Sequence, residues 1–137
     1  MIVSTSESPH YRTRFSDGTH NGIADTTVEN GGSDGGFRPH NLLEAALATC
    51  VNMAARMYAA DHNIPLTGVT TRVKLDRNTT EQSIFGYEVE FAGDLTVEQT
   101  ERLLLAANAC PVRRTLSRTI VFESAVAAPL LAAQKNL

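Results

Sequence analysis

The stretch PHNLLEAALATCVNMAARMYAAD (39–61) decides the fold, because a helical repeat runs through it without interruption. Apolar side chains recur in it at intervals of three and four residues, which indicates one apolar stripe along a helix. The stripe consists of Leu43, Ala46, Leu47, Cys50, Met53, Ala54 and Met57. Proline suits the first turn of a helix, and the many small side chains favour close packing by another helix. We therefore expect a long helix from Pro39 to about Asp61.

Shorter elements are expected on both sides of this helix. Alternation of apolar and polar side chains predicts strands at 9–16, 19–25, 67–75, 84–92 and 118–126. Thr96 and Gln99 form a capping box, which begins a helix that runs to about Asn108. CPVRRTLS (110–117) is expected to add a short helical turn. The order β–β–α–β–β–α–β predicts a single α+β domain over residues 1–137, with a peripheral tail at 127–137.

Composition excludes several classes of protein. The chain has 137 residues, of which 42% are hydrophobic and 20% charged, as in an ordinary soluble domain. Its net charge of −3 gives no reason to expect nucleic acid or an anionic membrane as a partner. No apolar run approaches the roughly 18–20 residues of a membrane span, and the first residues lack the pattern of a signal peptide. A cytoplasmic location is therefore expected.

Sites for metals and phosphate groups are not expected either. The four histidines, His10, His20, His40 and His62, lack the spacing of metal ligands. The glycine-rich run ENGGSDGG (29–36) predicts a loop, but it lacks the Gly-Lys-Ser/Thr ending of a phosphate loop. There is no Cys-x-x-Cys pair of a thioredoxin motif or a zinc knuckle. We expect no metal and no cofactor.

The chain has only two cysteines, and the first, Cys50, lies on the apolar stripe of the long helix. A free cysteine often packs as a small buried hydrophobic residue, which is the simpler interpretation. A position in the middle of a helix gains nothing from the helix dipole. Reactivity would therefore require a cation brought to Cys50 from elsewhere in the structure.

The second cysteine, Cys110, directly precedes Pro111 at the start of a predicted helical turn. This position places its sulfur near the free N–H groups of that turn, and Arg113 or Arg114 could add positive charge. Both effects favour a thiolate. The alternative is that Cys110 only marks a turn and that the arginines are solvated. Local physical chemistry alone therefore ranks Cys110 as the better nucleophile.

Two separate segments resemble the OsmC/Ohr family, the osmotically inducible and organic hydroperoxide resistance proteins. The first is GGSDGGFRPHNLLEAALATCVNMAARMYAADHNIPL, and the second is GDLTVEQTERLLLAANACPVRRTLS. Together they contain a glycine-rich lead-in, a cysteine in the middle of a long helix and a Cys-Pro-Val-x-Arg-Thr-Leu signature. The resemblance covers residues 18–125. It implies an intertwined homodimer in which strands wrap around two central helices.

The resemblance also implies a thiol peroxidase that reduces organic hydroperoxides at the subunit interface. Carried over, Cys50 would attack the peroxide and become a sulfenic acid, and Cys110 would then form a disulfide with it. A dithiol reductant of the lipoyl or thioredoxin type would restore both thiols. This assignment reverses the ranking from local physical chemistry.

An arginine and a glutamate beside the first thiol serve the reaction in the family. The candidates for the arginine are Arg12 and Arg14 in the N-terminal strands, and Arg38. The family glutamate that follows proline is missing, because this chain has Pro39-His40-Asn41 there. Glu44 is no obvious replacement, since it lies six positions from Cys50 and about 120° away around the helix.

Two other functions stay open. The same scaffold could bind a small hydrophobic ligand in an apolar cleft, with the thiols only as packing. Leu47, Met53 and Met57 would line the cleft together with Arg113. The cysteine pair could also serve a redox sensor or a dithiol reductase.

Overall fold

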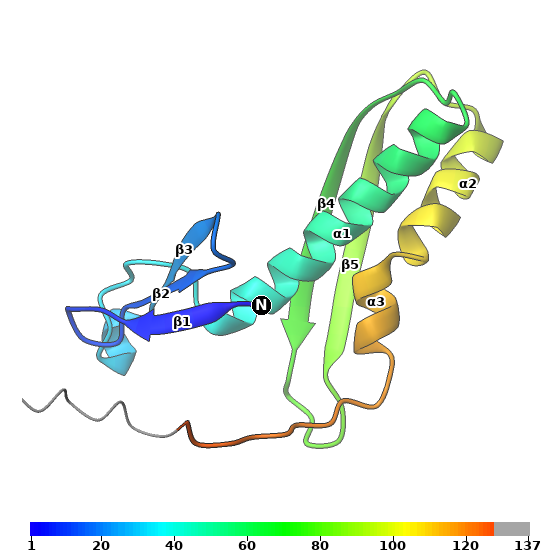
Figure 1. The fold of residues 1–137 in the computed structure, drawn as a ribbon. Helices are drawn as coiled ribbons and strands as arrows, with labels where there is room; N and C mark the ends of the chain where they lie inside the picture. The colour runs from blue at the N-terminus through cyan, green and yellow to red at the C-terminus, as the bar shows by residue number, and fades with distance from the viewer. Residues whose placement is uncertain (128–137) are drawn as a thin grey trace, which may run out of the picture.

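The long helix predicted from the apolar repeat is present in the computed structural model, which describes residues 1–127. Helix α1 spans Pro39–Asp61, with Pro39 in its first turn and Arg38 as the N-cap residue. It crosses one face of a long β-hairpin formed by strands β4 and β5 (Figure 1). The beginning and the end of the helix therefore agree with the prediction.

Strands β4 (Leu66–Asp76) and β5 (Ile84–Gly93) form the antiparallel hairpin. Their alternation sorts the side chains onto two faces, as the sequence predicts. One face packs apolar side chains such as Val73 and Tyr87, which lie opposite each other in the register, against the core below α1. The other face is charged, and Arg72 contacts Glu88 and Glu90 on it.

Helices α2 (Val97–Asn108) and α3 (Pro111–Leu116) follow the hairpin and lie beside α1 (Figure 1). The predicted capping box is confirmed: the Gln99 N–H donates to Thr96 Oγ1, and the Thr96 N–H donates to Gln99 Oε1. Leu103 and Ala107 of α2 are fully buried. The α2–α3 region thus forms a second helical wall of the core.

The N-terminal residues form a separate three-stranded antiparallel sheet in the order β1–β2–β3. It consists of β1 (Val3–Ser6), β2 (Thr13–Ser16) and β3 (Asn21–Ala24). The predicted strand at 9–16 begins only at Thr13, because the Glu7 N–H donates to the Arg12 carbonyl and closes a turn before it. Strand β1 was not predicted from the sequence.

The loop between β3 and α1 contains the short 3₁₀ helix η1 (Val28–Asn30) and is organised by the buried carboxylate of Asp25. This carboxylate accepts hydrogen bonds from the backbone N–H groups of Thr26, Ser33 and Gly35, and from Ser33 Oγ at 2.6 Å. These bonds, that from the Ser33 hydroxyl above all, hold the pKa of Asp25 well below its usual range. The glycine-rich run is thus a loop, as predicted, and an internal anion orders it.

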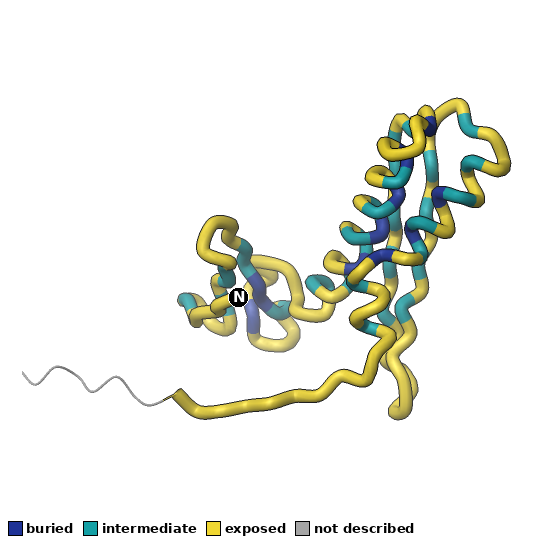
Figure 2. Tube along the Cα trace, turned by 45° about the vertical axis from the view of Figure 1, so that its right-hand side comes forward, coloured by how far each residue is buried: buried dark blue, intermediate teal, exposed yellow. Residues whose placement is uncertain are grey.

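Helix α1 has two apolar faces, and the single stripe expected from the sequence combines parts of both. The buried face has the spacing i, i+4 and consists of Leu47, Val51, Ala55 and Ala59. It faces the hairpin and α2 (Figure 2). Met53 and Met57 were expected on the buried stripe, but they are 56% and 67% exposed. Periodicity identified the apolar residues of α1 but not which of them face the core.

The strand predicted at 118–126 is absent from the structure, and residues 118–127 form no strand. The segment follows α3 and is exposed throughout, with Phe122 90% exposed. A strand needs the backbone of a neighbouring strand for its hydrogen bonds. None of the strand pairs among residues 1–127 includes this segment. Of the predicted tail at 127–137, residues 128–137 lie outside the described residues.

Candidate functional site

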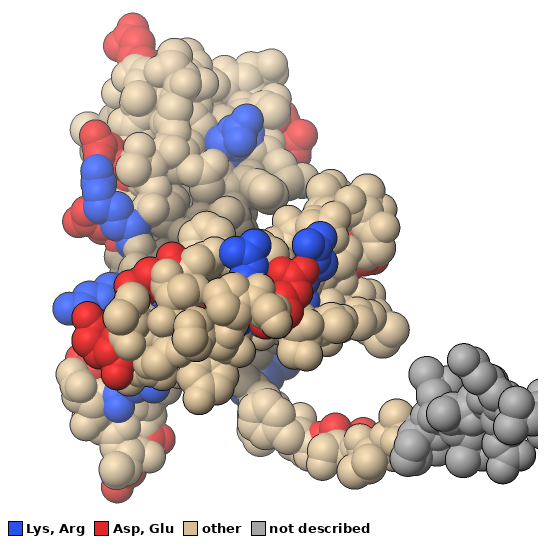
Figure 3. Space-filling model, turned by 90° about the vertical axis from the view of Figure 1, so that its left-hand side faces the viewer, with Lys and Arg blue, Asp and Glu red and all other residues tan. Residues whose placement is uncertain are grey.

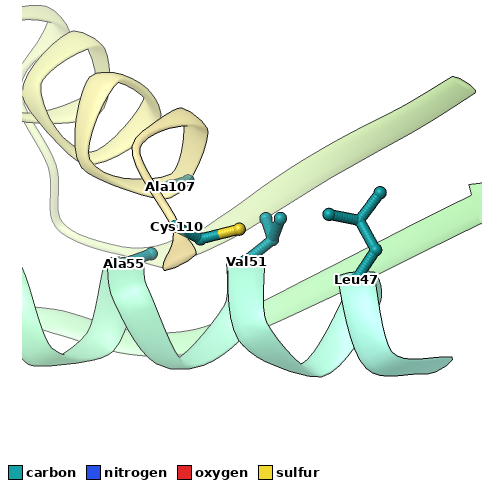
Figure 4. Close-up of a cluster of buried hydrophobic side chains, with 5 residues drawn as sticks. All are labelled: Leu47, Val51, Ala55, Ala107 and Cys110. Carbon is teal, nitrogen blue, oxygen red and sulfur yellow. The ribbon is translucent and has the colours of Figure 1, made fainter. Parts of the chain in front are cut away.

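The two cysteines, sixty positions apart in the sequence, are brought to one place by the packing of α1 against α2 and α3. Cys110 belongs to a buried cluster with Leu47, Val51 and other residues of α1 and α2 (Figure 4). Cys50 packs against this cluster from α1 and is partly exposed. Its thiol also contributes to the raised pKa of Cys110. The two cysteines therefore belong to one packed region, and both are free thiols.

Cys110 is the N-cap residue of α3, as its position before Pro111 predicts. Its Sγ accepts a hydrogen bond from the Arg113 N–H at 3.4 Å. The side chain is 0% exposed, and this burial raises the pKa of the thiol more than the N–H groups of Arg113 and Val112 lower it. The fold thus covers Cys110 and favours its protonated form, against the expectation that its local surroundings favour a thiolate.

The arginine side chains that were expected beside the Cys110 sulfur do not contribute their charge to it. Arg113 Nη1 donates to the carbonyl oxygen of Asn108 at 2.8 Å, so its guanidinium closes the junction between α2 and α3. The side chain of Asn108 accepts a second hydrogen bond, from Tyr87 Oη at 2.6 Å. Arg114 is exposed. The hydrogen bond from Arg113 to the sulfur thus comes from its backbone N–H and not from its guanidinium.

Cys50 lies at the border between the two faces of α1. On one side it contacts the buried cluster, and on the other it adjoins the exposed face, which we define by Leu43, Met53 and Met57. Leu47, a predicted binding residue, is buried in the cluster with Cys110, whereas Met53 and Met57 point outward. Cys50 is thus the thiol that a reagent from outside can reach first.

The three candidate arginines lie in the N-terminal part of the chain. Glu7 binds two of them, since its Oε2 accepts from Arg12 Nε at 3.2 Å and its Oε1 accepts from Arg14 Nε. These bonds, first that of Arg14, lower the pKa of Glu7. Arg38 precedes α1 and lines a polar hollow of about 280 Å³ with Glu44 and Arg77. Within residues 1–127, no hydrogen bond joins Cys50 to any arginine.

Glu44 connects the start of α1 to the end of β4. Its Oε1 accepts from the Leu75 N–H, and its Oε2 accepts from Asn41 Nδ2, both at 2.8 Å. These two bonds, first that of Leu75, lower the pKa of Glu44. Both carboxylate oxygens are thus engaged away from Cys50, which agrees with the expectation that Glu44 does not replace the family glutamate.

An open apolar groove of about 580 Å³ lies between the N-terminal sheet and the first half of α1. Phe15 and Ala24 line it from the sheet, and Leu42, Ala46 and Thr49 line it from the helix. Thr49, one of its lining residues, directly precedes Cys50 in the sequence. The groove is lined by apolar and small side chains, and Cys50 is not among them.

The surface charges, the arrangement of possible metal ligands and the character of the helices bear on other kinds of site. On the face drawn in Figure 3, basic and acidic side chains are interspersed rather than gathered by sign. Within the described residues, no three His, Cys, Asp or Glu side chains are placed to hold a metal ion. No helix of residues 1–127 has both the length and the apolar character of a membrane span.

Comparison with known families decides the relationship of this chain. A family model described as OsmC-like protein matches residues 31–125, which include both cysteines. The chain belongs to the OsmC-like family. None of the curated proteins matches it.

Solved structures have the same OsmC-like fold at low sequence identity. A protein from Psychrobacter arcticus, described as an osmotic stress induced and detoxification response protein, has a TM-score of 0.70 and 23% identity, over 83% of this chain and 85% of that one. An OsmC-like protein from Mycoplasma pneumoniae has 0.69 and 18%, over 85% of both chains. The organic hydroperoxide resistance protein OhrB of Bacillus subtilis has 0.58 and 20%, over 84% and 89%.

Glu7, Tyr87 and Asn108 of this OsmC-like chain make contacts that were not predicted from the sequence. Glu7 could have been found only by recognising β1, since the pairing of Ser6 with Thr13 brings Glu7 next to Arg12. Tyr87 and Asn108 are 21 positions apart and carry no local signal of their contact. Their hydrogen bond arises from the packing of α2 on the hairpin.

Proposed function

We propose that this protein is a thiol peroxidase that reduces organic or lipid hydroperoxides in defence against oxidative stress. The observation that carries the proposal is the proximity of Cys50 and Cys110, one partly exposed and the other buried behind it. The solved relatives described as organic hydroperoxide resistance proteins support the same class of substrate. Neither a metal nor a cofactor is needed for this chemistry.

In the first step the Cys50 thiolate attacks the terminal oxygen of the hydroperoxide. The O–O bond breaks, the alkoxide leaves and takes up a proton to become an alcohol, and Cys50 becomes a sulfenic acid. In the second step the Cys110 sulfur attacks the Cys50 sulfur. The S–S bond forms, and the hydroxyl leaves as water with the proton of Cys110. A dithiol reductant of the lipoyl or thioredoxin type then reduces the disulfide.

The thiolate needs a cation, and we propose that a second copy of the chain supplies it. The exposed apolar face of α1 is suited to pack against the same face of a partner helix. Arg12, Arg14 or Arg38 of one subunit would then approach Cys50 of the other, so that the site is completed at the interface. An opposite charge within a few ångströms favours the ionised thiol and orients the peroxide oxygen.

The organic part of the substrate would lie against apolar side chains near Cys50. Met53 and Met57 are suited to this, because methionine adapts its shape to different alkyl chains. Leu47 supports the pocket from beneath, and Arg113 fixes the neighbouring α2–α3 junction. We further propose that residues 1–137 act as one domain in the cytoplasm, without nucleic acid or a membrane as a partner.

A second function is favoured by the apolar groove between the N-terminal sheet and α1. A groove of about 580 Å³ is large enough for a small hydrophobic ligand. In that case the thiols would serve only as packing, and the protein would bind without catalysis.

Stopped-flow mixing of the reduced protein with cumene hydroperoxide separates the two functions. A peroxidase consumes the hydroperoxide far faster than free cysteine does, and peptide mapping without reductant then finds Cys50 linked to Cys110. A rate no higher than that of free cysteine would reject the peroxidase. Saturable binding of a fatty acid to Cys50→Ser, with no peroxide consumption by the wild type, would favour the binding protein.

A further inference from the structure

Asn108, the last residue of α2, is held by two hydrogen bonds from different elements. Tyr87 of β5 donates to its side chain at 2.6 Å, and the guanidinium of Arg113 in α3 donates to its carbonyl oxygen at 2.8 Å. The backbone N–H of Arg113 donates to Cys110 Sγ. We call Tyr87, Asn108 and Arg113 the Asn108 bracket. It connects the hairpin, through the α2–α3 junction, to the second sulfur.

We propose that the Asn108 bracket positions Cys110 for its attack on oxidised Cys50. Tyr87, Asn108 and Arg113 are positioning residues, because they act through Cys110 and not on the substrate. The inference rests on the proposed peroxidase function, and it concerns the second step of that reaction. In this step the S–S bond forms, the S–O bond of the sulfenic acid breaks, and water leaves with the proton of Cys110.

The state of Cys110 makes its position important for this step. Burial raises the pKa of the thiol, so that charge does little to activate it. The rate then depends on how closely and in what direction the sulfur is held, because a disulfide forms only within a narrow geometry. A resolving thiol of this kind reacts quickly when it is held next to its partner.

Apolar packing in the buried cluster holds the Cys110 side chain, but the segment that carries it has few polar side-chain contacts besides the bracket. Only Ala109 separates the last residue of α2 from Cys110. Helix α3 has six residues, none of which is fully buried, and it continues into the exposed segment 118–127. Val112 and Leu116 make its partly buried apolar contacts. The bracket therefore supplies the polar anchors of the segment that carries the sulfur.

Tyr87→Phe tests the proposal, because it removes the phenol oxygen and keeps the ring that packs against the core. The matched control is Tyr58→Phe. Tyr58 Oη accepts a hydrogen bond from Arg102 Nε at 2.9 Å, so this control also breaks a bond between a tyrosine and α2, but one far along the helix from Cys110. A purely structural role predicts that the two variants lose similar stability and form the disulfide at the wild-type rate.

A positioning role predicts a different pattern. In Tyr87→Phe the oxidation of Cys50 keeps its wild-type rate within about 2-fold, and disulfide formation slows about 5- to 10-fold, which corresponds to one lost hydrogen bond. The sulfenic acid then accumulates, and dimedone traps more of it than in the wild type or in Tyr58→Phe. An unchanged rate of disulfide formation in folded Tyr87→Phe would overturn the proposal.

A second measurement keeps the inference separate from the proposed function. When each protein is equilibrated with reduced and oxidised glutathione, the fraction with the Cys50–Cys110 disulfide reports how favourably the two thiols are held together. We expect this equilibrium constant to fall several-fold in Tyr87→Phe and in Arg113→Met, and not in Tyr58→Phe.

The outcomes separate the two proposals. If the wild type does not react with hydroperoxides but the variants show this order of equilibrium constants, the proposed peroxidase function is rejected and the positioning role of the bracket is supported. Equal constants in all four proteins would overturn the bracket. Arg113→Met changes an exposed side chain, so it tests the bracket even if Tyr87→Phe fails to fold.

Discussion

Cys50 and Cys110 have the same side chain, but the fold gives them opposite surroundings. Cys110 has the better local sequence, since it caps a helix and accepts a backbone hydrogen bond, yet it is sealed in the core. Cys50 has no local advantage, yet it lies at the border of the core where an external molecule can reach it. Local sequence thus set the backbone geometry around each sulfur, and tertiary packing set its accessibility.

The largest expected effect comes from removing each sulfur in turn. Cys50→Ser should lower the rate of hydroperoxide consumption by about 1,000-fold or more, because the nucleophile is lost. Cys110→Ser should leave the first oxidation within about 3-fold of the wild type, because serine also caps a helix and Cys110 acts only later. Single-turnover stopped-flow experiments with cumene hydroperoxide measure both rates. A larger loss of rate in Cys110→Ser than in Cys50→Ser would contradict the roles assigned to the two thiols.

The second prediction concerns the exposed apolar face of α1 beside Cys50. Met57→Glu should weaken the self-association of the chain by about 100-fold or more, since a carboxylate would enter an apolar interface. Peroxidase activity should fall with it if the partner subunit supplies the cation. Sedimentation equilibrium measures the association. Lys74→Glu, on the charged outer side of the hairpin, is the control and should leave the mass unchanged. A wild-type monomer with full activity would contradict the shared site.

The third prediction uses the raised pKa of Cys110. In Cys50→Ser, alkylation of Cys110 by iodoacetamide at pH 8 should be at least about 10-fold slower than that of free cysteine, because the thiol is buried and protonated. The rate should still be rising with pH at pH 9, because the pKa of this thiol is raised above its usual value of 9.0 and its thiolate fraction is therefore still increasing there. Since the folded state holds this proton more tightly than the unfolded chain, Cys110 stabilises the fold below that pH, and this contribution is lost as the pH rises through the raised pKa. Fast alkylation at pH 7 would contradict the assigned surroundings.

The smallest effect is expected at the N-cap of α2, which can be compared with the sulfur cap of α3. Thr96→Ala removes the hydroxyl that accepts from Gln99 and should lower the free energy of unfolding by about 1 kcal/mol. The rates of both thiol steps should stay near those of the wild type, because this cap lies at the far end of α2 from Cys110. Urea unfolding and single-turnover kinetics measure the two quantities. A large change in rate would mean that α2 transmits strain to the site.

The sequence predicted the elements whose signals are local. The capping box at Thr96, the proline in the first turn of α1 and the alternation of β4 and β5 all appear as expected. The same is true of Cys110 as a helix cap. Each of these features depends on residues that are close in the sequence, so neighbouring residues are enough to predict it.

Features that depend on contacts between residues far apart in the sequence could not be predicted from such local signals. The apolar letters of α1 do not say which face meets the hairpin, because its buried and exposed faces interleave at intervals of three and four. Alternation at 118–126 predicts an extended segment but not a neighbour to pair with. The burial of Cys110 requires residues from α1 and α2 together. The local signals around Cys110 favoured a thiolate and therefore did not predict its raised pKa.

The sulfur that first receives the peroxide oxygen tests the central claim most directly. Reduced wild-type protein is mixed with one equivalent of cumene hydroperoxide in the presence of dimedone, and peptide mass mapping locates the adduct. Cys50 should carry the dimedone, and the protein that escapes trapping should contain the Cys50–Cys110 disulfide. An adduct on Cys110 alone, or two unmodified thiols beside intact hydroperoxide, would contradict the account.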